Sequence, residues 1–251
     1  MTNVFFIGAG PGDPELITIK GKNIIDNADV VIYAGSLVNK EILNSRKQDS
    51  QIYNSAKMNL EEIIAVIKKN ALEGKVVARV HTGDPSIYGA IKEQMDLLDE
   101  EGIEYEVIPG VSSFVAAAAV LKKEFTLPNV SQTVICTRIS GRTDVPNKED
   151  LEKLSVHKAS MAIFLSVSMI KELVKKLLKN YDSTTPVAVV YKATWKDQKI
   201  LEGNLGNIVD IVKKSGIKKT AIILVGDFLS SNYERSKLYD KNFSHEYRGA
   251  T

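Results

Sequence analysis

The stretch VFFIGAGPGDPELI at residues 4–17 decides how the fold begins. The apolar run at residues 4–7 is typical of a buried strand, and the glycines that follow it end the strand. Asp13 and Pro14 then predict a helix start, because an Asp side chain accepts a hydrogen bond from a free backbone amide and proline suits the first helical position. The apolar face of this helix is supplied by residues at helical spacing, namely Leu16, Ile17, Ile24 and Ile25.

The glycine turn lacks the spacing of a phosphate-binding loop. The dinucleotide fingerprint is G-x-G-x-x-G and the P-loop ends in Gly-Lys-Ser/Thr, whereas the glycines at residues 8–12 run G-x-G-x-G. Pro11 has no amide hydrogen to offer a phosphate, and the carboxylate of Asp13 lies at the helix start where a phosphate would bind. We therefore reject phosphate binding as the main purpose of this loop. A turn for another kind of ligand and a tight turn without a ligand both remain open.

Composition indicates a soluble enzyme without a metal. The chain has 251 residues, 44% of them hydrophobic, and its 33 basic and 31 acidic residues give a formal charge of +2, so a basic stripe for nucleic acid is not expected. No apolar stretch approaches membrane-spanning length and the amino terminus does not look like a signal peptide, which predicts a cytoplasmic location. One cysteine, Cys136, and three unpaired histidines argue against a metal site, and Cys136 is expected in the core.

Strand-like runs alternate with helical patterns along the whole chain, which predicts an α/β fold. In the first half the alternation is that of an open, mostly parallel sheet, with strands expected at residues 30–33, 75–80 and 105–108 and helices at residues 60–72, 87–98 and 112–120. In the second half we expect strands at residues 132–137, 162–165, 186–191 and 220–225, and helices at residues 169–178 and 208–214. A long exposed loop is expected at residues 138–153. The predicted division is an N-terminal α/β domain at residues 1–115, a C-terminal α/β domain at residues 116–240, and a polar aromatic tail at residues 241–251.

Gly-Asp-Pro occurs twice, at residues 12–14 and again at residues 83–85 in RVHTGDPSIYG. Each copy follows an apolar strand and precedes a helical pattern. Ligands of open α/β sheets bind beyond the carboxyl ends of the strands, so we expect both turns to face one cleft.

These motifs resemble those of a known family. GAGPGDPELIT, RVHTGDPSIYG, IPGVSS, QTVICTR and VYKATW occur in the order found in the tetrapyrrole methylases. YAGSLV at residues 33–38, GRTDVP at residues 141–146 and the tail sequence SKLYDKNFSHEYR are similar to the members that methylate precorrin-4 or cobalt-precorrin-4 at ring carbon 11. The resemblance covers nearly the whole chain. It implies an S-adenosyl-L-methionine-dependent C-methyltransferase of corrin (cobalamin) biosynthesis, with S-adenosyl-L-homocysteine as a product.

The resemblance also implies two α/β domains with the cofactor in the cleft between them, and a homodimer. The cofactor carries no phosphate, and its positive sulfonium and flat adenine suit carbonyl oxygens and an apolar slot. Matched motif by motif, the implied cofactor-binding residues are Pro11, Thr82, Gly83, Asp84, Ile87, Ser112, Ser113, Leu165 and Ala193. Sirohaem-type members have Gly-Gly-Asp at residues 82–84 and Tyr-Asp-Arg-Leu-Val where this chain has YAGSLV. For that reason no catalytic residue is transferred from them.

The implied substrate carries many carboxylates, for which cations at strand ends are suitable partners. Candidate substrate-binding residues are His81, Arg138, Arg142 and Lys192. Each has a simpler alternative: a solvated surface charge for the three cations, and a structural histidine for His81. Arg79 is a weaker candidate than Arg138 and Arg142, and Tyr191 and Trp195 either line the macrocycle or pack in the core.

Other functions remain open on the sequence. The same fold could serve another tetrapyrrole carbon, a ribosomal RNA or a translation factor, although the near-neutral charge disfavours RNA. A tetrapyrrole carrier is disfavoured by the complete set of methyl-donor motifs, and a dehydrogenase by the absence of G-x-G-x-x-G. Lys, Ile and Asn are abundant in the chain, a composition that is common in low-GC anaerobes. This composition favours the route in which the substrate already contains cobalt.

Overall fold

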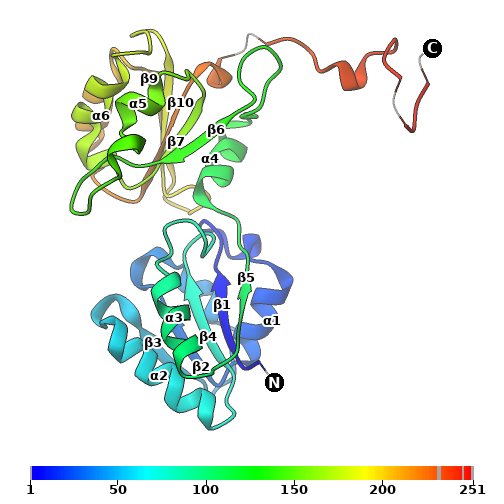
Figure 1. Ribbon diagram of the computed structural model, residues 1–251, viewed down its shortest axis with the longest axis vertical. Coiled ribbons are helices and arrows are strands. Elements are labelled where there is room, and N and C mark those ends of the chain that lie inside the picture. Colours follow the sequence, from blue (N-terminus) through cyan, green and yellow to red (C-terminus); the bar gives the residue numbers. More distant parts are fainter. Residues whose placement is uncertain (1, 231–232, 245, 250–251) are drawn as a thin grey trace. The chain divides into compact units, whose positions relative to one another are not determined.

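A computed structural model describes residues 2–230, 233–244 and 246–249. The expected domain ranges also include residues 1, 231–232, 245 and 250–251, which lie outside this part. The chain forms two compact units, one of Met1–Ala116 with Ala193–Asp197 and the other of Ala117–Lys192 with Gln198–Thr251. The α/β fold with two sheets agrees with the expected fold class (Figure 1). Residues 193–197 join the first unit although they lie between two strands of the second, which the sequence did not suggest.

The first unit is a five-stranded parallel sheet with helices on both faces (Figure 1). Its strands lie in the order β3-β2-β4-β1-β5. In chain order its elements are β1 (Val4–Gly8), α1 (Ile19–Asn27), β2 (Val30–Tyr33), β3 (Gln51–Asn54), α2 (Leu60–Leu72), β4 (Val77–His81), α3 (Lys92–Glu100), β5 (Tyr105–Ile108) and α4 (Ser113–Leu121), which runs on into the second unit.

Alternation along the central strands assigns each side chain of the first unit to one face. Ile7 of β1 and Val80 of β4 pack with Ile25 of α1, whereas Val4 and Phe6 pack with α2 and α3 on the opposite face. Because the sheet is covered on both sides, β1 and β2 are nearly continuous apolar runs. On β4 this alternation puts Arg79 and His81 on the α2 and α3 face.

The second unit contains a mixed sheet in the order β6-β7-β10-β8-β9. Only β6 and β7 are parallel, and the other pairings are antiparallel. A large apolar core beneath it includes Leu173, Leu177 and Val212. Its elements are β6 (Val134–Thr137), α5 (Leu151–Ser155), β7 (Ser160–Ile163), α6 (Ile170–Leu177), β8 (Pro186–Tyr191), β9 (Lys199–Asn204), α7 (Ile208–Ser215) and β10 (Ala221–Val225).

Several sequence expectations need correction. The helix expected after Asp13 is a single 3-10 turn at Pro14–Leu16, and α1 begins only after Thr18, whose side chain caps it by accepting from the amide of Gly21. The helix expected at residues 87–98 begins at Lys92, because Tyr88 and Ala90 adopt left-handed backbone angles. Cys136 is exposed on the edge strand β6 rather than buried, and β3 and β9 were not foreseen.

Candidate functional site

Three turns meet at the carboxyl edge of the first sheet. Strands β4, β1 and β5 are neighbours and parallel, so the turns that follow them leave the sheet side by side. The amide of Gly10 donates to the carbonyl of Gly83 over 3.2 Å, and the amide of Gly83 donates to the carbonyl of Gly10 over 2.8 Å. The two turns that carry the Gly-Asp-Pro motifs are therefore joined directly.

The third turn, after β5, packs against the other two without room for side chains. A Cβ on Gly110 would lie 2.2 Å from the carbonyl oxygen of Gly83, and a Cβ on Gly8 would lie 2.6 Å from the same atom. Both approaches are far inside contact distance and involve backbone atoms that cannot move aside. Glycine is required at these positions by the close approach of three backbone segments.

Asp84 ties two of these turns together through its carboxylate. One oxygen accepts from the amide and the hydroxyl of Ser86, and the other accepts from the amide of Gly110 over 2.8 Å. Partial burial would raise the pKa of Asp84, but the hydrogen bonds from Ser86 and Gly110 outweigh it and hold the pKa below its usual range. Asp13 has a smaller role, since among the residues that the structure describes its side chain accepts only from the amide of Glu15.

The segment at residues 193–197 covers the first glycine turn. The indole Nε1 of Trp195 donates to the carbonyl oxygen of Pro11 over 2.9 Å, and the amide of Asp13 donates to the hydroxyl of Thr194 over 2.9 Å. The indole lies so close to Gly12 that a Cβ there would come within 2.1 Å of Trp195 Cδ1. Trp195 therefore packs on the turn. The VYKATW motif drew attention to this residue but did not indicate its contact with the glycine turn.

Most of the expected cofactor-binding residues lie in the first unit. The turns and the adjoining segments contain Pro11, Thr82, Gly83, Asp84, Ile87, Ser112, Ser113 and Ala193. Leu165 belongs to the second unit, two residues after the end of β7, with a left-handed backbone angle and 67% of its surface exposed. An exposed leucine held in this conformation is unusual, since left-handed angles strain residues with a Cβ. Its role as a cofactor contact stays a prediction.

His81 and Arg79 are buried on the α3 face of β4 rather than open to a ligand. His81 is 3% exposed and Arg79 is 5% exposed. Burial, with a contribution from the charge of Arg79, lowers the pKa of His81 to about 3, so the imidazole is neutral at physiological pH. Burial also lowers the pKa of Arg79 to about 10. A neutral, buried His81 is poorly suited to pair with a substrate carboxylate, which favours the structural alternative for this residue.

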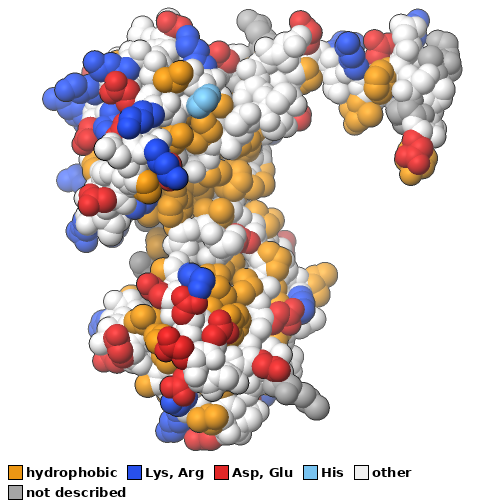
Figure 2. All heavy atoms as spheres, in the orientation of Figure 1, with side chains coloured by type: hydrophobic (Ala, Val, Ile, Leu, Met, Phe, Trp, Pro, Cys, Tyr) orange, Lys and Arg blue, Asp and Glu red, His pale blue; other side chains and the backbone are white. Residues whose placement is uncertain are grey.

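The other candidate substrate-binding residues belong to the second unit, whose visible face shows many Lys and Arg side chains (Figure 2). Arg138 donates to the carbonyl oxygens of Thr143 over 2.9 Å and Asp144 over 2.7 Å, so its guanidinium closes the loop that follows β6. Arg142 is exposed at the tip of that loop. The ammonium of Lys192 lies 5.5 Å from the ring centre of Tyr191. Arg142 is thus the most accessible of the three cations.

The chemistry of the three turns suits a ligand that carries positive charge. Their sequences, GAGPGD, TGD and PGVSS, contain no Lys or Arg. They offer backbone carbonyl groups, the hydroxyls of Ser112 and Ser113, and two carboxylates. A sulfonium cofactor fits this donor set, whereas a phosphate would meet fixed negative charge. Within the described ranges, no three His, Cys, Asp or Glu side chains come together as metal ligands, and no helix is long and apolar enough to cross a membrane.

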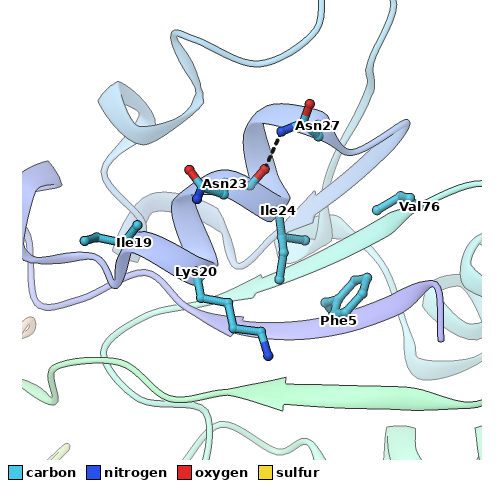
Figure 3. Close-up of a pocket in the computed structure, with 7 residues that line it drawn as sticks. All are labelled: Phe5, Ile19, Lys20, Asn23, Ile24, Asn27 and Val76. Carbon is cyan, nitrogen blue, oxygen red and sulfur yellow. Dashed lines mark hydrogen bonds between the residues drawn. The ribbon is translucent and has the colours of Figure 1, made fainter.

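A separate groove of about 630 Å³ runs along α1, and Phe5 of β1 forms part of its wall (Figure 3). Its walls include Phe5, Ile24 and Val76, and its polar groups are Lys20 and the amides of Asn23 and Asn27. Lys20 forms an ion pair with Glu106 of β5. The groove contains no carboxylate, thiol or imidazole in its lining, so we place the chemistry at the glycine turns instead.

Comparison with known proteins agrees with this reading of the turns. Residues 3–209 match the family model of the Tetrapyrrole (Corrin/Porphyrin) Methylases. The match spans more than half of the chain, including all three turns and residues 193–197. The chain belongs to the tetrapyrrole methylase family.

The chain is also similar to individual members over nearly its full length. It is 62% identical to the cobalt-precorrin-4 C(11)-methyltransferase of Methanocaldococcus jannaschii, covering 98% of this chain and 95% of that protein. It is 46% identical to the precorrin-4 C(11)-methyltransferase of Pseudomonas aeruginosa, covering 98% of each. A crystal structure of a cobalamin biosynthetic enzyme, cobalt precorrin-4 methyltransferase, superposes with a TM-score of 0.89 at 46% identity, covering 90% of this chain and 95% of that one.

Proposed function

We propose that this protein is an S-adenosylmethionine-dependent methyltransferase that methylates ring carbon 11 of cobalt-precorrin-4 in corrin ring synthesis. The observation that carries the proposal is the full-length similarity to the Methanocaldococcus enzyme of that name. Metal-free precorrin-4 is the alternative acceptor, because the more distant Pseudomonas relative is named for it.

The joined glycine turns are the proposed methyl-donor site. When bound, S-adenosylmethionine supplies an electrophilic methyl group on a positively charged sulfur. The hydroxyls of Ser112 and Ser113 orient polar groups of the cofactor. The carbonyl groups of Gly83 and Asp84 already accept from the amides of Gly10 and Ile87, so these two residues shape the turn. Asp84 acts mainly through position, since its oxygens already accept hydrogen bonds from Ser86 and Gly110. Pro11, Ile87 and Ala193 provide apolar surface for the adenine.

Arg142 and Lys192 are the proposed partners of substrate carboxylates, because both are cationic and belong to segments that follow strands of the second unit. Arg138 acts indirectly by closing the loop that presents Arg142. Displacement at a sulfonium carbon needs an aligned nucleophile and little else, so the protein contributes chiefly by positioning the acceptor carbon and excluding water. We assign no side chain as a base.

The direct test is a methyl-transfer assay with S-adenosylmethionine that carries a carbon-13 label in its methyl group. Cobalt-precorrin-4, metal-free precorrin-4 and uroporphyrinogen III are supplied as acceptors in separate reactions. We expect one labelled methyl group at carbon 11 of cobalt-precorrin-4. Preferred labelling of precorrin-4 would select the metal-free substrate. Transfer only to uroporphyrinogen III, or to another carbon, would contradict the proposal.

We also propose that the protein is cytoplasmic and works as a homodimer, without nucleic acid or membrane as a partner. The dimer rests on the family resemblance alone. Light scattering coupled to size-exclusion chromatography gives the mass in solution, and a single species near the 27.6 kDa of one chain would contradict it.

A further inference from the structure

The loop at residues 85–91, between the Asp84 turn and α3, has a strained backbone. Tyr88 and Ala90 have φ angles of 57° and 49°, in the left-handed region that residues with a Cβ rarely adopt. Between them, a Cβ on Gly89 would lie 2.0 Å from the carbonyl oxygen of Pro85, so the loop is tightly wound on itself. Such a conformation persists only where the surrounding structure imposes it.

A buried chain of hydrogen bonds holds the far end of this loop. Gln94 of α3 donates through Nε2 to the carbonyl oxygen of Ala90 over 2.8 Å. Its Oε1 accepts from Arg79 Nε over 3.0 Å, and Arg79 Nη1 donates to the carbonyl oxygen of Ile32 over 3.3 Å. The chain therefore connects strands β2 and β4 to the strained residue through two side chains that are at most 5% exposed.

His81 restrains the middle of the loop from the same face of β4. The backbone of Gly89 partly offsets the lowering of the His81 pKa, and the His81 ring lies 6.0 Å from the ring of Phe6. His81 also directly precedes Thr82, the first residue of the turn that Gly83 joins to Gly10. One strand end thus supports both the turn and the loop that follows it.

An arginine is a costly residue at this buried position. Within the described part of the chain, Arg79 has no carboxylate partner and its hydrogen bonds go to an amide and a carbonyl oxygen. A buried cation without a counter-ion is costly, and apolar residues of similar size commonly fill such sites with no loss of stability. What an apolar residue could not do is orient Gln94 toward Ala90.

We propose that Arg79, Gln94 and His81 are positioning residues that hold the 85–91 loop in its strained conformation and thereby preorganise the Thr82–Ile87 side of the methyl-donor site. The inference rests on the proposed function for the identity of the ligand. The claim that these residues restrain the loop is independent of the proposed function, because the restraint is measured in the free protein.

Gln94→Glu separates the two hydrogen bonds of Gln94. The carboxylate keeps an acceptor for Arg79 but has no hydrogen to donate to Ala90. Asn70→Asp is a matched control in the same unit, since Asn70 is also buried, donates to the carbonyl of Val66 and accepts from Lys75. Ala90→Gly, added to Gln94→Glu, removes the strain that the hydrogen bond opposes.

The readouts are amide hydrogen exchange across residues 85–91 in the free protein and the Kd for S-adenosylhomocysteine by calorimetry. Gln94→Glu is expected to speed exchange in the loop and weaken binding, each by about tenfold, the loss expected for one hydrogen bond. Asn70→Asp is expected to leave both unchanged, and Ala90→Gly to restore part of the affinity.

Unchanged exchange in Gln94→Glu would overturn the inference, as would faster exchange with unchanged affinity. A wild-type protein that does not bind S-adenosylhomocysteine would contradict the proposed function instead, and the exchange rates would still decide whether Gln94 holds the loop. Circular dichroism confirms that each variant is folded before either measurement.

Discussion

Gly10 and Gly83 exchange two backbone hydrogen bonds, which join the turn after β1 to the turn after β4. Both residues have positive φ angles, 78° and 62°, so each turn needs glycine for its own geometry as well as for the approach of the other. The pair joins the glycine of the second Gly-Asp-Pro to the glycine two residues before the first, so the two turns form one continuous backbone surface.

Gly110→Ala is expected to separate the third turn from this surface. The new methyl group would meet the carbonyl oxygen of Gly83 at 2.2 Å, and the backbone must shift to admit it. We expect a loss of about 1–3 kcal/mol in the free energy of unfolding, as for other overpacked sites. Urea denaturation followed by circular dichroism measures it. Gly249→Ala, where the methyl group has open space, is the control, and an equal loss there would refute the explanation.

Asp84→Ala is expected to destabilise the protein more than Asp13→Ala. Both variants lose a cap on a following backbone amide, at about 1 kcal/mol. Only Asp84→Ala also leaves the amide of Gly110 without its acceptor, which separates two turns. Urea denaturation of both variants at neutral pH tests the order, and equal losses would show that the bond to Gly110 contributes nothing.

The effect of Asp84→Ala should also depend on pH. The folded pKa of Asp84 lies below the unfolded value of 3.8, so as pH falls the unfolded chain takes up the proton first. The stabilisation by Asp84 is therefore complete above the unfolded pKa of 3.8 and is lost as pH falls through the folded pKa. The difference between wild type and Asp84→Ala should shrink in that window, and a constant difference would contradict the assignment.

The lowered pKa of His81 predicts that the free energy of unfolding decreases on mild acidification. Its pKa falls from 6.5 to about 3 on folding, so between these values the unfolded chain binds a proton that the native protein does not. Stability from this residue therefore decreases as pH falls below 6.5, by about 1.4 kcal/mol for each pH unit. His81→Gln should flatten this dependence between pH 6.5 and 4.5 in urea denaturation. The exposed His157 provides the control variant, His157→Gln, and the same flattening there would exclude His81 as the source.

Gly12→Ala is expected to displace Trp195, the only tryptophan of the chain. The added methyl group would lie 2.1 Å from Trp195 Cδ1, so the indole must leave the turn and lose its hydrogen bond to Pro11. Tryptophan emission should therefore shift to longer wavelength in the folded variant. An unshifted spectrum would mean that the indole does not pack on Gly12.

Much of the fold could be predicted from local pattern. The ranges of β2, α2 and β8 agree with the periodicity of their apolar residues, because these elements bury faces whose spacing is visible in one dimension. Start signals were less reliable. Asp13-Pro14 begins one turn of 3-10 helix before the chain straightens at Ile17, and Thr18 supplies the cap for α1. Both are good caps, and only packing against the sheet chooses between them.

Only part of the candidate site could be predicted from the sequence. The motifs indicated Gly83, Asp84 and the Pro-Gly turn, but residue type alone gave a wrong picture of side chains that are buried. The sequence suggested His81 as a partner of a substrate carboxylate, but its side chain is only 3% exposed and lies beneath a strained loop. Arg79 read as a weak substrate contact and instead supports Gln94. No spacing rule indicates that residues 79 and 94 share one buried hydrogen-bond chain, or that residue 81 lies on the same face of β4.

The sequence by itself determined the α/β alternation, the glycine turns and the family, since these depend on periodicity and on residues next to one another in the chain. Only the tertiary structure decided that Gly10 binds Gly83, that Asp84 binds Gly110, that Trp195 covers Pro11, and that Arg79 and His81 face inward. The physical reason is that hydrogen bonding and burial depend on which strands become neighbours, and the order β4-β1-β5 joins segments far apart in sequence.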